Sequence, residues 1–263
     1  MTKEFAPKYK RNEHGWVIFP SDAGYRKDVF PPEVSDHPAK ANSFLVEAII
    51  EYVSDLDDRI MDVMAGTGTI LLGALMGRRV TCVDISEKYC NLARAGLAAM
   101  EKLAPGISSQ CMIINAPCQS VLPLPEHNHI IFSPQYANIM KSKGTDKLTK
   151  EKYGDISEYS QHPLNLGVMN EFLWGQAMEL VYRKCYDSLV VGGTMTLIIK
   201  DHMRDRRRVP LTQRAVKSCE DIGFALSEWY KWDAPGSVYT SIYRARGWEV
   251  VEDEDIVILG KSN

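Results

Sequence analysis

Two acidic residues and a pair of glycines form the pattern with the clearest chemical meaning in this chain. Residues 61–70 read Met-Asp-Val-Met-Ala-Gly-Thr-Gly-Thr-Ile, so an apolar strand leads through a small-residue turn directly into a helix. Glycines let the backbone approach a ligand closely, and the N–H groups at a helix N-terminus are unpaired. Asp84 ends the next apolar segment, where an acid binds ribose hydroxyls in nucleotide-binding α/β sheets. The pattern indicates a nucleotide-like ligand.

The spacing of the glycines excludes two common nucleotide motifs. A phosphate-binding P-loop needs Gly-Lys-Ser/Thr, and no lysine follows Gly66 or Gly68. A dinucleotide fingerprint needs a third glycine where this chain has Leu71. No Gly-x-Ser-x-Gly occurs either, which disfavours a serine hydrolase.

A third segment, Ile-Ile-Phe-Ser-Pro-Gln-Tyr at 130–136, also ends an apolar run. A Ser-Pro-x-Tyr sequence alone is usually a turn. Here it becomes evidence for a functional site because it ends an apolar run that follows Asp84. A fourth segment, His-Pro-Ala-Lys at 37–40, precedes an apolar helix. In this order the four segments resemble the amino-group DNA methyltransferases that use S-adenosylmethionine, including the compact enzymes of phages and prophages.

The resemblance implies a set of cofactor-binding residues. Asp84 would bind the ribose, Ile85 would cover the adenine, and Asn115-Ala116 would lie near the adenine amine. Thr67 and Thr69 have an alternative role as helix caps. His37 and Lys40 would lie beside the methionine carboxylate, and their alternative role is a solvated segment that leads into the helix. The full set is His37, Lys40, Asp62, Ala65, Gly66, Thr67, Gly68, Thr69, Asp84, Ile85, Asn115 and Ala116.

The resemblance also implies catalytic roles for the tetrapeptide. Ser133 and the carbonyl of Pro134 would accept hydrogen bonds from the target amine, and Tyr136 would stack on a base swung out of the helix. Gln135 departs from the family pattern, which has proline there. Serine at the first position favours cytosine N4 over adenine N6. A guanine-N2 type RNA methyltransferase, or a non-catalytic nucleic-acid-binding protein, is the alternative.

Apolar periodicity predicts an α/β protein with a mostly parallel, Rossmann-like sheet covered by helices on both faces. The resemblance adds an antiparallel C-terminal strand pair and seven strands, and the last two predicted strands have no predicted helix between them. The predicted strands are 59–64, 79–84, 110–115, 128–133, 194–200, 224–232 and 255–260. The predicted helices are 43–53, 69–77, 86–101, 169–190 and 211–222.

We divide the chain into an N-terminal arm (1–36) and a methyltransferase domain (37–263). The arm carries aromatic and proline residues without clear periodicity, and we expect it to be extended and packed on the body. Residues 137–168 form a polar insertion far longer than the usual connection of about 4–6 residues. It is a candidate substrate-recognition loop, with a disordered linker as the alternative.

The net charge of −3 does not suggest nucleic-acid binding, so any such contact must come from local basic runs, whose alternative role is a solvated surface. Candidate DNA contacts are Lys141, Lys143, Arg204, Arg206, Arg207 and Arg208. The histidines lack metal-ligand spacing, and we expect reduced, mostly buried cysteines and a cytoplasmic protein without membrane segments. A homodimer, or a separate specificity or nuclease partner of a restriction-modification system, is compatible with the sequence.

Overall fold

A seven-stranded sheet organises the structure, a computed structural model that describes residues 3–36, 40–137, 162–204, 206–234 and 238–262. Its strand order is β3-β2-β1-β4-β5-β9-β8. The strands are β1 (Arg59–Asp62), β2 (Arg79–Asp84), β3 (Cys111–Asn115), β4 (His127–Phe132), β5 (Leu189–Ile199), β8 (Phe224–Asp233) and β9 (Asp253–Lys261). The first five pair in parallel, and β9 is antiparallel to both of its neighbours. The predicted fold class, a Rossmann-like sheet with an antiparallel C-terminal pair, is confirmed.

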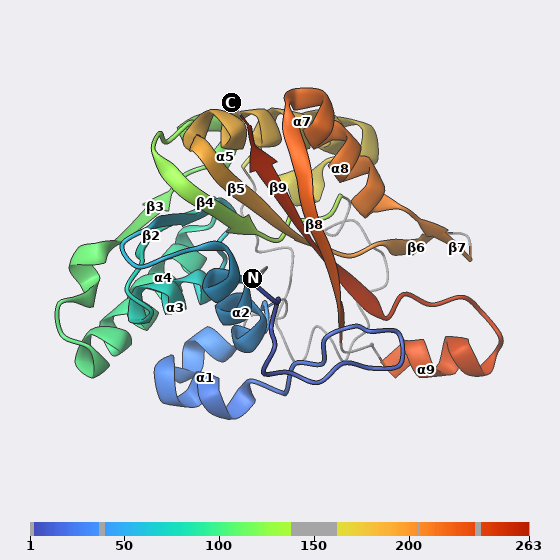
Figure 1. Cartoon of the computed structure of the whole chain (residues 1–263), viewed down its shortest axis with the longest axis horizontal. Helices are drawn as coiled ribbons and strands as arrows, with labels where there is room; N and C mark the ends of the chain where they lie inside the picture. The colour runs from blue at the N-terminus through green and yellow to red at the C-terminus, as the bar shows by residue number, and fades with distance from the viewer. Residues whose placement is uncertain (1–2, 37–39, 138–161, 205, 235–237, 263) are drawn as a thin grey trace.

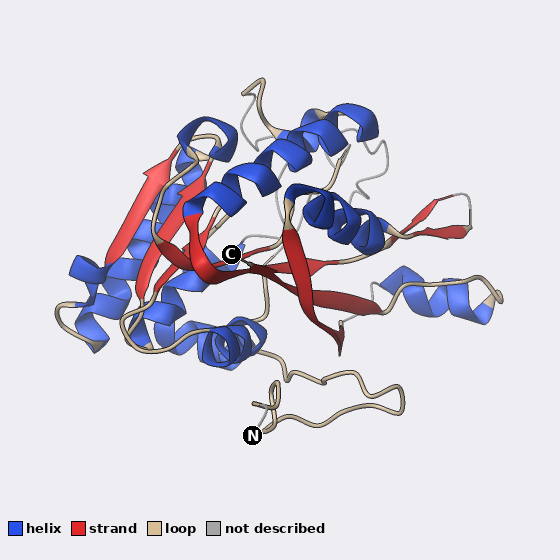
Figure 2. Ribbon diagram, turned by 45° about the horizontal axis from the view of Figure 1, so that its top comes forward, coloured by secondary structure: helices blue, strands red, loops and turns tan. Residues whose placement is uncertain are grey.

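Helices cover both faces of this sheet and bury two separate apolar clusters (Figures 1 and 2). One face carries α2 (Ser43–Val53), α3 (Leu72–Leu75) and α4 (Glu87–Leu103); the other carries α5 (Cys118–Val121), α7 (Glu171–Ser188) and α8 (Leu211–Ile222). Asn42, Ser86 and Asn170 each accept a backbone N–H at a helix start. These caps explain why three of the predicted helices begin within about two residues of the positions expected from the sequence.

The N-terminal segment packs on the sheet and on α2. The Phe5 ring stacks on Tyr230 of β8 at a centroid distance of 4.7 Å, and Val17 forms a bridge with Trp232. The segment is not extended throughout, because it includes a short helix, α1 (Ala23–Val29). The domain boundary at residue 36 stays a prediction.

Two further elements were not expected from the sequence. A hairpin of β6 (His202–Arg204) and β7 (Arg207–Val209) projects from the end of β5, and α9 (Val238–Ala245) lies in the connection from β8 to β9 (Figures 1 and 2). The expectation that no helix separates the last two strands is therefore wrong. This helix has eight residues and lies between Gly236 and Gly247. A segment of that length is too short for its apolar periodicity to be recognised in the sequence.

A partly buried charge network fixes the hairpin to the sheet. Arg208 of β7 donates to Asp201 at 2.7 Å and to both carboxylate oxygens of Asp253 at 3.1 and 2.8 Å. Lys231 contacts Asp253 and also lies 2.7 Å from Asp255. The hydrogen bonds with Arg208 and Lys231 outweigh burial and lower the pKa of Asp253 to about 2. The base of the hairpin is thus held by fully ionised partners.

Five of the six cysteines are buried, Cys111 is half-buried, and all six are free thiols, in agreement with the expectation. Among the described residues we find no helix with the length and apolar character needed to cross a membrane.

Candidate active site

The turn after β1 is shaped by two glycines with left-handed backbone angles. Gly66 has φ of 52° and Gly68 has φ of 83°. A Cβ at Gly68 would lie 2.9 Å from Leu71 Cδ1 and 3.0 Å from Ala93 Cβ, so this position also has no room for a side chain. Gly66 lines the cavity described below, whereas Gly68 serves the turn and its packing against α4.

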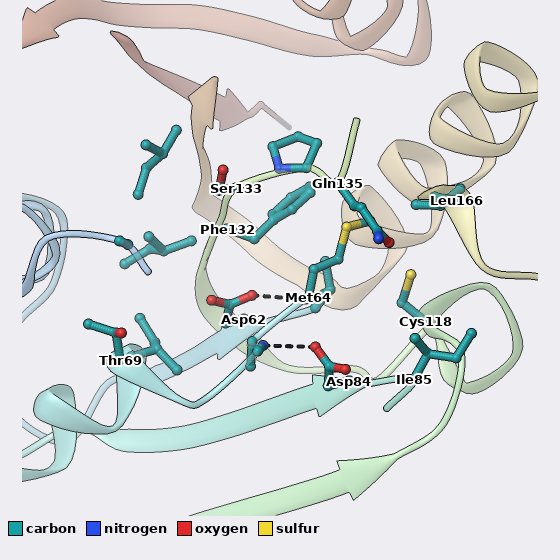
Figure 3. A pocket seen from close by; sticks show the side chains of 18 of the residues that line it. Asp62, Met64, Thr69, Asp84, Ile85, Cys118, Phe132, Ser133, Gln135 and Leu166 are labelled. Atoms are coloured by element: carbon teal, nitrogen blue, oxygen red, sulfur yellow. Dashed lines mark hydrogen bonds between the residues drawn. The ribbon is translucent and has the colours of Figure 1, made fainter. Parts of the chain in front are cut away.

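Asp84 joins the ends of two strands through its carboxylate. One oxygen accepts the Gly66 N–H at 2.8 Å (Figure 3), and the other accepts the Ser86 N–H, also at 2.8 Å. An ionised carboxylate has about four acceptor positions, so two are left for a ligand. Burial raises the pKa of this carboxyl group above its ordinary value, even though both hydrogen bonds lower it.

Asp62, at the end of β1, lies near Asp84. Its carboxylate accepts the Met64 N–H at 2.8 Å. Burial, together with the nearby charge of Asp84, raises the pKa of Asp62 to about 8. Two carboxyl groups in one poorly solvated site favour a cationic ligand, because a positive charge would stabilise their ionised forms.

A cavity of about 390 Å³ opens at the carboxyl edge of the parallel strands. In Figure 3, Thr69 lies at one end and Ile85 with Cys118 at the other, with Asp62 between them. The predicted site residues that line it are Lys40, Asp62, Ala65, Gly66, Thr67, Thr69, Asp84, Ile85, Ser133, Pro134, Gln135 and Tyr136. The structure therefore brings the glycine turn, the acids and the tetrapeptide around one cavity.

The tetrapeptide loop after β4 is held from both sides. The Tyr136 hydroxyl accepts the backbone N–H of Lys200 at the end of β5 at 2.8 Å. The Gln135 carbonyl accepts the indole N–H of Trp174 from α7 at 2.6 Å. Burial raises the pKa of the Tyr136 phenol, so the ring stays neutral. The side-chain nitrogen of Gln135 is buried and has no hydrogen-bond partner, which is unusual for a protein interior.

Some predicted cofactor residues have other contacts. The Asn115 amide donates to the backbone carbonyl of Asp84 at 3.1 Å, and the Ala116 N–H donates to the same carbonyl at 3.0 Å. Neither residue lines the cavity. Thr67 and Thr69 line it, and neither the short helix at 69–71 nor α3 has a side-chain cap. His37 lies outside the described residues.

Sequence reasoning missed several lining residues. They follow β3, belong to the turn after β1 or end the long insertion, and they are Met64, Pro117, Cys118, Gln119, Leu164, Asn165 and Leu166. The Gln119 amide donates to the Leu164 carbonyl at 3.0 Å, which ties the end of the insertion to the cavity wall. The position of 117–119 after a parallel strand could have identified them. Residues 138–161 of the insertion lie outside the described chain.

The basic run divides into different environments. Arg206 and Arg207 are exposed, and the Arg206 guanidinium lies 4.6 Å from the centre of the Trp248 ring. Arg204 pairs with Glu171 at 2.8 Å. Arg208 belongs to the partly buried charge network, and its donors are bonded to Asp201 and Asp253, so it is not free to bind a phosphate. Lys141 and Lys143 lie outside the described residues.

The described residues contain no metal centre. No three of the described histidine, cysteine, aspartate and glutamate residues are grouped so that they could hold an ion.

Comparison with known sequences finds one family. Residues 3–95 match the model of the N6/N4 DNA methylases, described as "DNA methylase". The matched region includes α1, the glycine turn and Asp84, and it ends within α4. No curated protein sequence matches the chain.

Solved structures share the fold at low identity. TrmN from Thermus thermophilus is 18% identical with a TM-score of 0.54; the match covers 90% of this chain and 52% of TrmN, so the chain spans about half of that protein. The glycopeptide N-methyltransferase MtfA complexed with S-adenosyl-L-methionine is 12% identical with a TM-score of 0.52, covering 97% of this chain and 100% of MtfA. A methyltransferase from Methanosarcina mazei, described as SAM-dependent, is 14% identical with a TM-score of 0.51, covering 81% and 97%.

These similarities confirm the resemblance noted in the sequence. At such identities the structural matches establish the fold, and the family match adds the DNA methylase signature over residues 3–95. The MtfA structures hold sinefungin in one case and S-adenosyl-L-methionine in another. The chain has the class I methyltransferase fold, and its residues 3–95 match the N6/N4 DNA methylase model.

Proposed function

We propose that this protein transfers a methyl group from S-adenosylmethionine to an exocyclic amine of a DNA base, with cytosine N4 favoured over adenine N6. The observation that carries the proposal is the single cavity shared by the acid-lined glycine turn and the Ser133–Tyr136 loop. A cofactor in the first part would place its reactive end beside the second.

The cavity residues fit this cofactor. Asp84 has two acceptor positions for ribose hydroxyls, and Ile85 with Cys118 offers an apolar surface for the adenine. Thr69 and Lys40 would then lie toward the methionine end. Asp62, between the two ends, would face a cationic part of the cofactor, which suits a carboxylate whose pKa is raised in its absence.

The cofactor supplies an electrophilic methyl group on a sulfonium. The protein must then orient the amine nitrogen, whose lone pair is otherwise shared with the ring of the base. The Ser133 hydroxyl and the Pro134 carbonyl would accept the two amine N–H groups, and the surplus proton would leave to solvent after transfer. Tyr136, fixed by its bond to Lys200, would stack on the base.

Gln135 supplies a donor that the usual proline lacks. Both cytosine and adenine carry a ring nitrogen acceptor next to the target amine. The buried, unpartnered amide nitrogen of Gln135 could be satisfied by this acceptor after a small rotation, since a buried donor without a partner costs about 1–3 kcal/mol.

The β6–β7 hairpin with the loop after α9 is the surface we propose for DNA. Arg206 and Arg207 are exposed and make no ion pair with any described residue. Arg246 lies 5.7 Å from the Trp248 ring centre, and Tyr243 stacks on that ring at 5.2 Å. Trp248 is half-buried and Tyr243 is exposed, and guanidinium groups beside such rings suit phosphates and unpaired bases. The hairpin begins two residues after Lys200, which holds Tyr136.

The proposed reaction is tested by methyl transfer from labelled S-adenosylmethionine to unmethylated genomic DNA and to total RNA in parallel. Nucleoside mass spectrometry should find N4-methylcytosine in DNA. N6-methyladenine in DNA would support the proposed reaction but identify adenine as the target base. Methylguanine confined to RNA would replace DNA with RNA as the substrate, and no transfer despite measured cofactor binding would contradict the enzymatic proposal.

Tyr136→Ala should lower kcat about 10- to 100-fold, because stacking on an aromatic ring is worth about 1–3 kcal/mol per base. Tyr136→Phe is the matched control: it keeps the ring and removes only the acceptor of the Lys200 N–H, so its loss should be less than about tenfold. The dissociation constant for the cofactor should change little in either variant. A parallel loss of cofactor affinity in both would assign Tyr136 to the cofactor site instead.

Cofactor affinity should rise with pH up to about 8. The pKa of Asp62 is raised to about 8 in the free protein, and a cationic ligand favours its ionised form, so binding below this pH must release a proton. By the same linkage the free fold loses stability as pH rises toward about 8, since Asp62 ionises more readily when unfolded. Calorimetric titration from about pH 6 to 9 measures the dependence.

Asp62→Asn is the control for this profile. It should flatten the pH dependence and weaken binding at pH 8, whereas S-adenosylhomocysteine, which lacks the sulfonium, should show how much of the effect belongs to the sulfur centre. If the pH dependence of cofactor binding is unchanged in the variant, the titrating group is Asp84, whose pKa is also raised.

The double variant Arg206→Gln/Arg207→Gln should weaken DNA binding and reduce the slope of log K against log salt by about 1–2, as expected for two lost phosphate contacts. Arg94→Gln/Lys102→Gln on α4 removes the same charge from another exposed surface and should have little effect. Equal losses in both variants would show a dependence on total charge alone and would exclude the hairpin as a specific DNA surface.

A further inference from the structure

Arg26 on α1 is a buried cation with unused hydrogen-bonding capacity. Its exposure is 3%, and arginine is almost never buried without partners. The Nε–H donates to Asp22 at 2.7 Å, and Nη2 donates to the Ala41 carbonyl and to the Thr69 hydroxyl, the latter at 3.3 Å. Nη1 is buried and has no partner. A guanidinium in this position is expected to have a further acceptor.

Asp22 does not supply that acceptor. Its Oδ2 already accepts the Nε–H of Arg26 and the N–H of Ser43, each at 2.7 Å. Although burial opposes ionisation, these contacts lower the pKa of Asp22 below its ordinary value. The Nη1 group of Arg26, beside this ionised carboxylate, is therefore left without an acceptor.

The contacts of Arg26 lead directly to one end of the cavity. Ala41 and Thr69 both line it, and Thr69 lies at the end away from Ile85 and Cys118 (Figure 3). A hydroxyl has one proton, and because Thr69 accepts from Arg26 its own proton is available to another acceptor. This end of the cavity thus combines a directed hydroxyl donor with a fixed positive charge behind it.

We propose that Arg26 is a positioning residue for the carboxylate of the cofactor. It orients the Thr69 hydroxyl toward this carboxylate and stabilises the negative charge from behind the cavity wall. The inference rests on the proposed function, because the carboxylate is the only anionic group of S-adenosylmethionine. It makes α1, in the N-terminal segment, part of the cofactor site.

Two ligands that differ in this group test the proposal. S-adenosylhomocysteine carries the amino-acid carboxylate, whereas 5′-methylthioadenosine has the same nucleoside and thioether without the amino-acid group. Arg26→Met should weaken S-adenosylhomocysteine about tenfold or more, as for loss of a charge-assisted interaction, and should change methylthioadenosine less than about twofold. Arg26→Lys, which keeps the charge and loses the fork, should lie between wild type and Arg26→Met.

Thr69→Val tests the route of the effect. If Arg26 acts through the hydroxyl, the Arg26→Met and Thr69→Val effects on S-adenosylhomocysteine binding should be less than additive in the double variant. Equal weakening of both ligands by Arg26→Met, or full additivity of the two substitutions, would overturn the assignment.

The folded state needs its own control, since Arg26→Met leaves Asp22 without its cation. Asp22→Asn/Arg26→Met removes both charges and keeps an acceptor for the Ser43 N–H, and it should show the same ligand discrimination at a higher melting temperature than the single variant. Failure of the wild-type protein to bind either ligand would reject the proposed function, whereas binding without discrimination in the variants would reject only the role of Arg26.

Discussion

The carboxylate of Asp84 is the contact on which the geometry of the site depends. In the parallel pair, Asp62 lies opposite Cys82, so Asp84 extends two residues beyond the end of β1 and reaches the turn that follows it. Its side chain accepts the Gly66 N–H, while its backbone carbonyl accepts from Asn115 and Ala116 after β3. One residue therefore fixes the ends of three neighbouring strands. Gly66, whose N–H makes this contact, has a left-handed φ of 52° and lines the cavity.

Charge is arranged unevenly along the cavity. Asp62 and Asp84 lie near its middle, where burial raises both pKa values, and Arg26 contacts Thr69 at one end. An apolar surface formed by Ile85 and Cys118 closes the other end. A ligand with an apolar ring, a central cation and a terminal carboxylate would complement this order. The arrangement stores unfavourable interactions in the free protein that such a ligand relieves.

The sequence predicted the sheet and 12 of the 26 residues that line the cavity, because those features follow from local patterns. Strand ends collect at one edge of a parallel sheet, so an acid or a proline after an apolar run can be placed without knowing any tertiary contact. Arg208 shows the limit of this reasoning. It belongs to an unbroken run of arginines, but alternation in β7 and the carboxylate of Asp253 on a distant strand separate it from Arg207. Arg208 and Asp253 are 45 residues apart in the sequence, and only the fold brings them together.

Arg26 was missed for a related reason. Its helix has seven residues, too short for a readable period, and its partners at Ala41 and Thr69 are 15 and 43 residues away. Asn115 is the opposite case: the sequence placed it correctly at the end of β3, but the direction of its side chain depends on the Asp84 carbonyl. Position along a strand was predictable, whereas the hydrogen-bond partner was not.

Gln135 is where this chain departs from the family pattern, and the structure shows how the loop keeps its shape. Proline would fix one backbone angle and remove one donor. Here the Trp174 indole holds the Gln135 carbonyl from one side, and the Lys200 N–H holds Tyr136 from the other. Two hydrogen bonds from rigid elements on either side of the loop restrict the same segment that proline would restrict. The substitution therefore changes the source of rigidity and adds a donor at the cavity wall, so the loss of proline is not by itself an argument against catalysis.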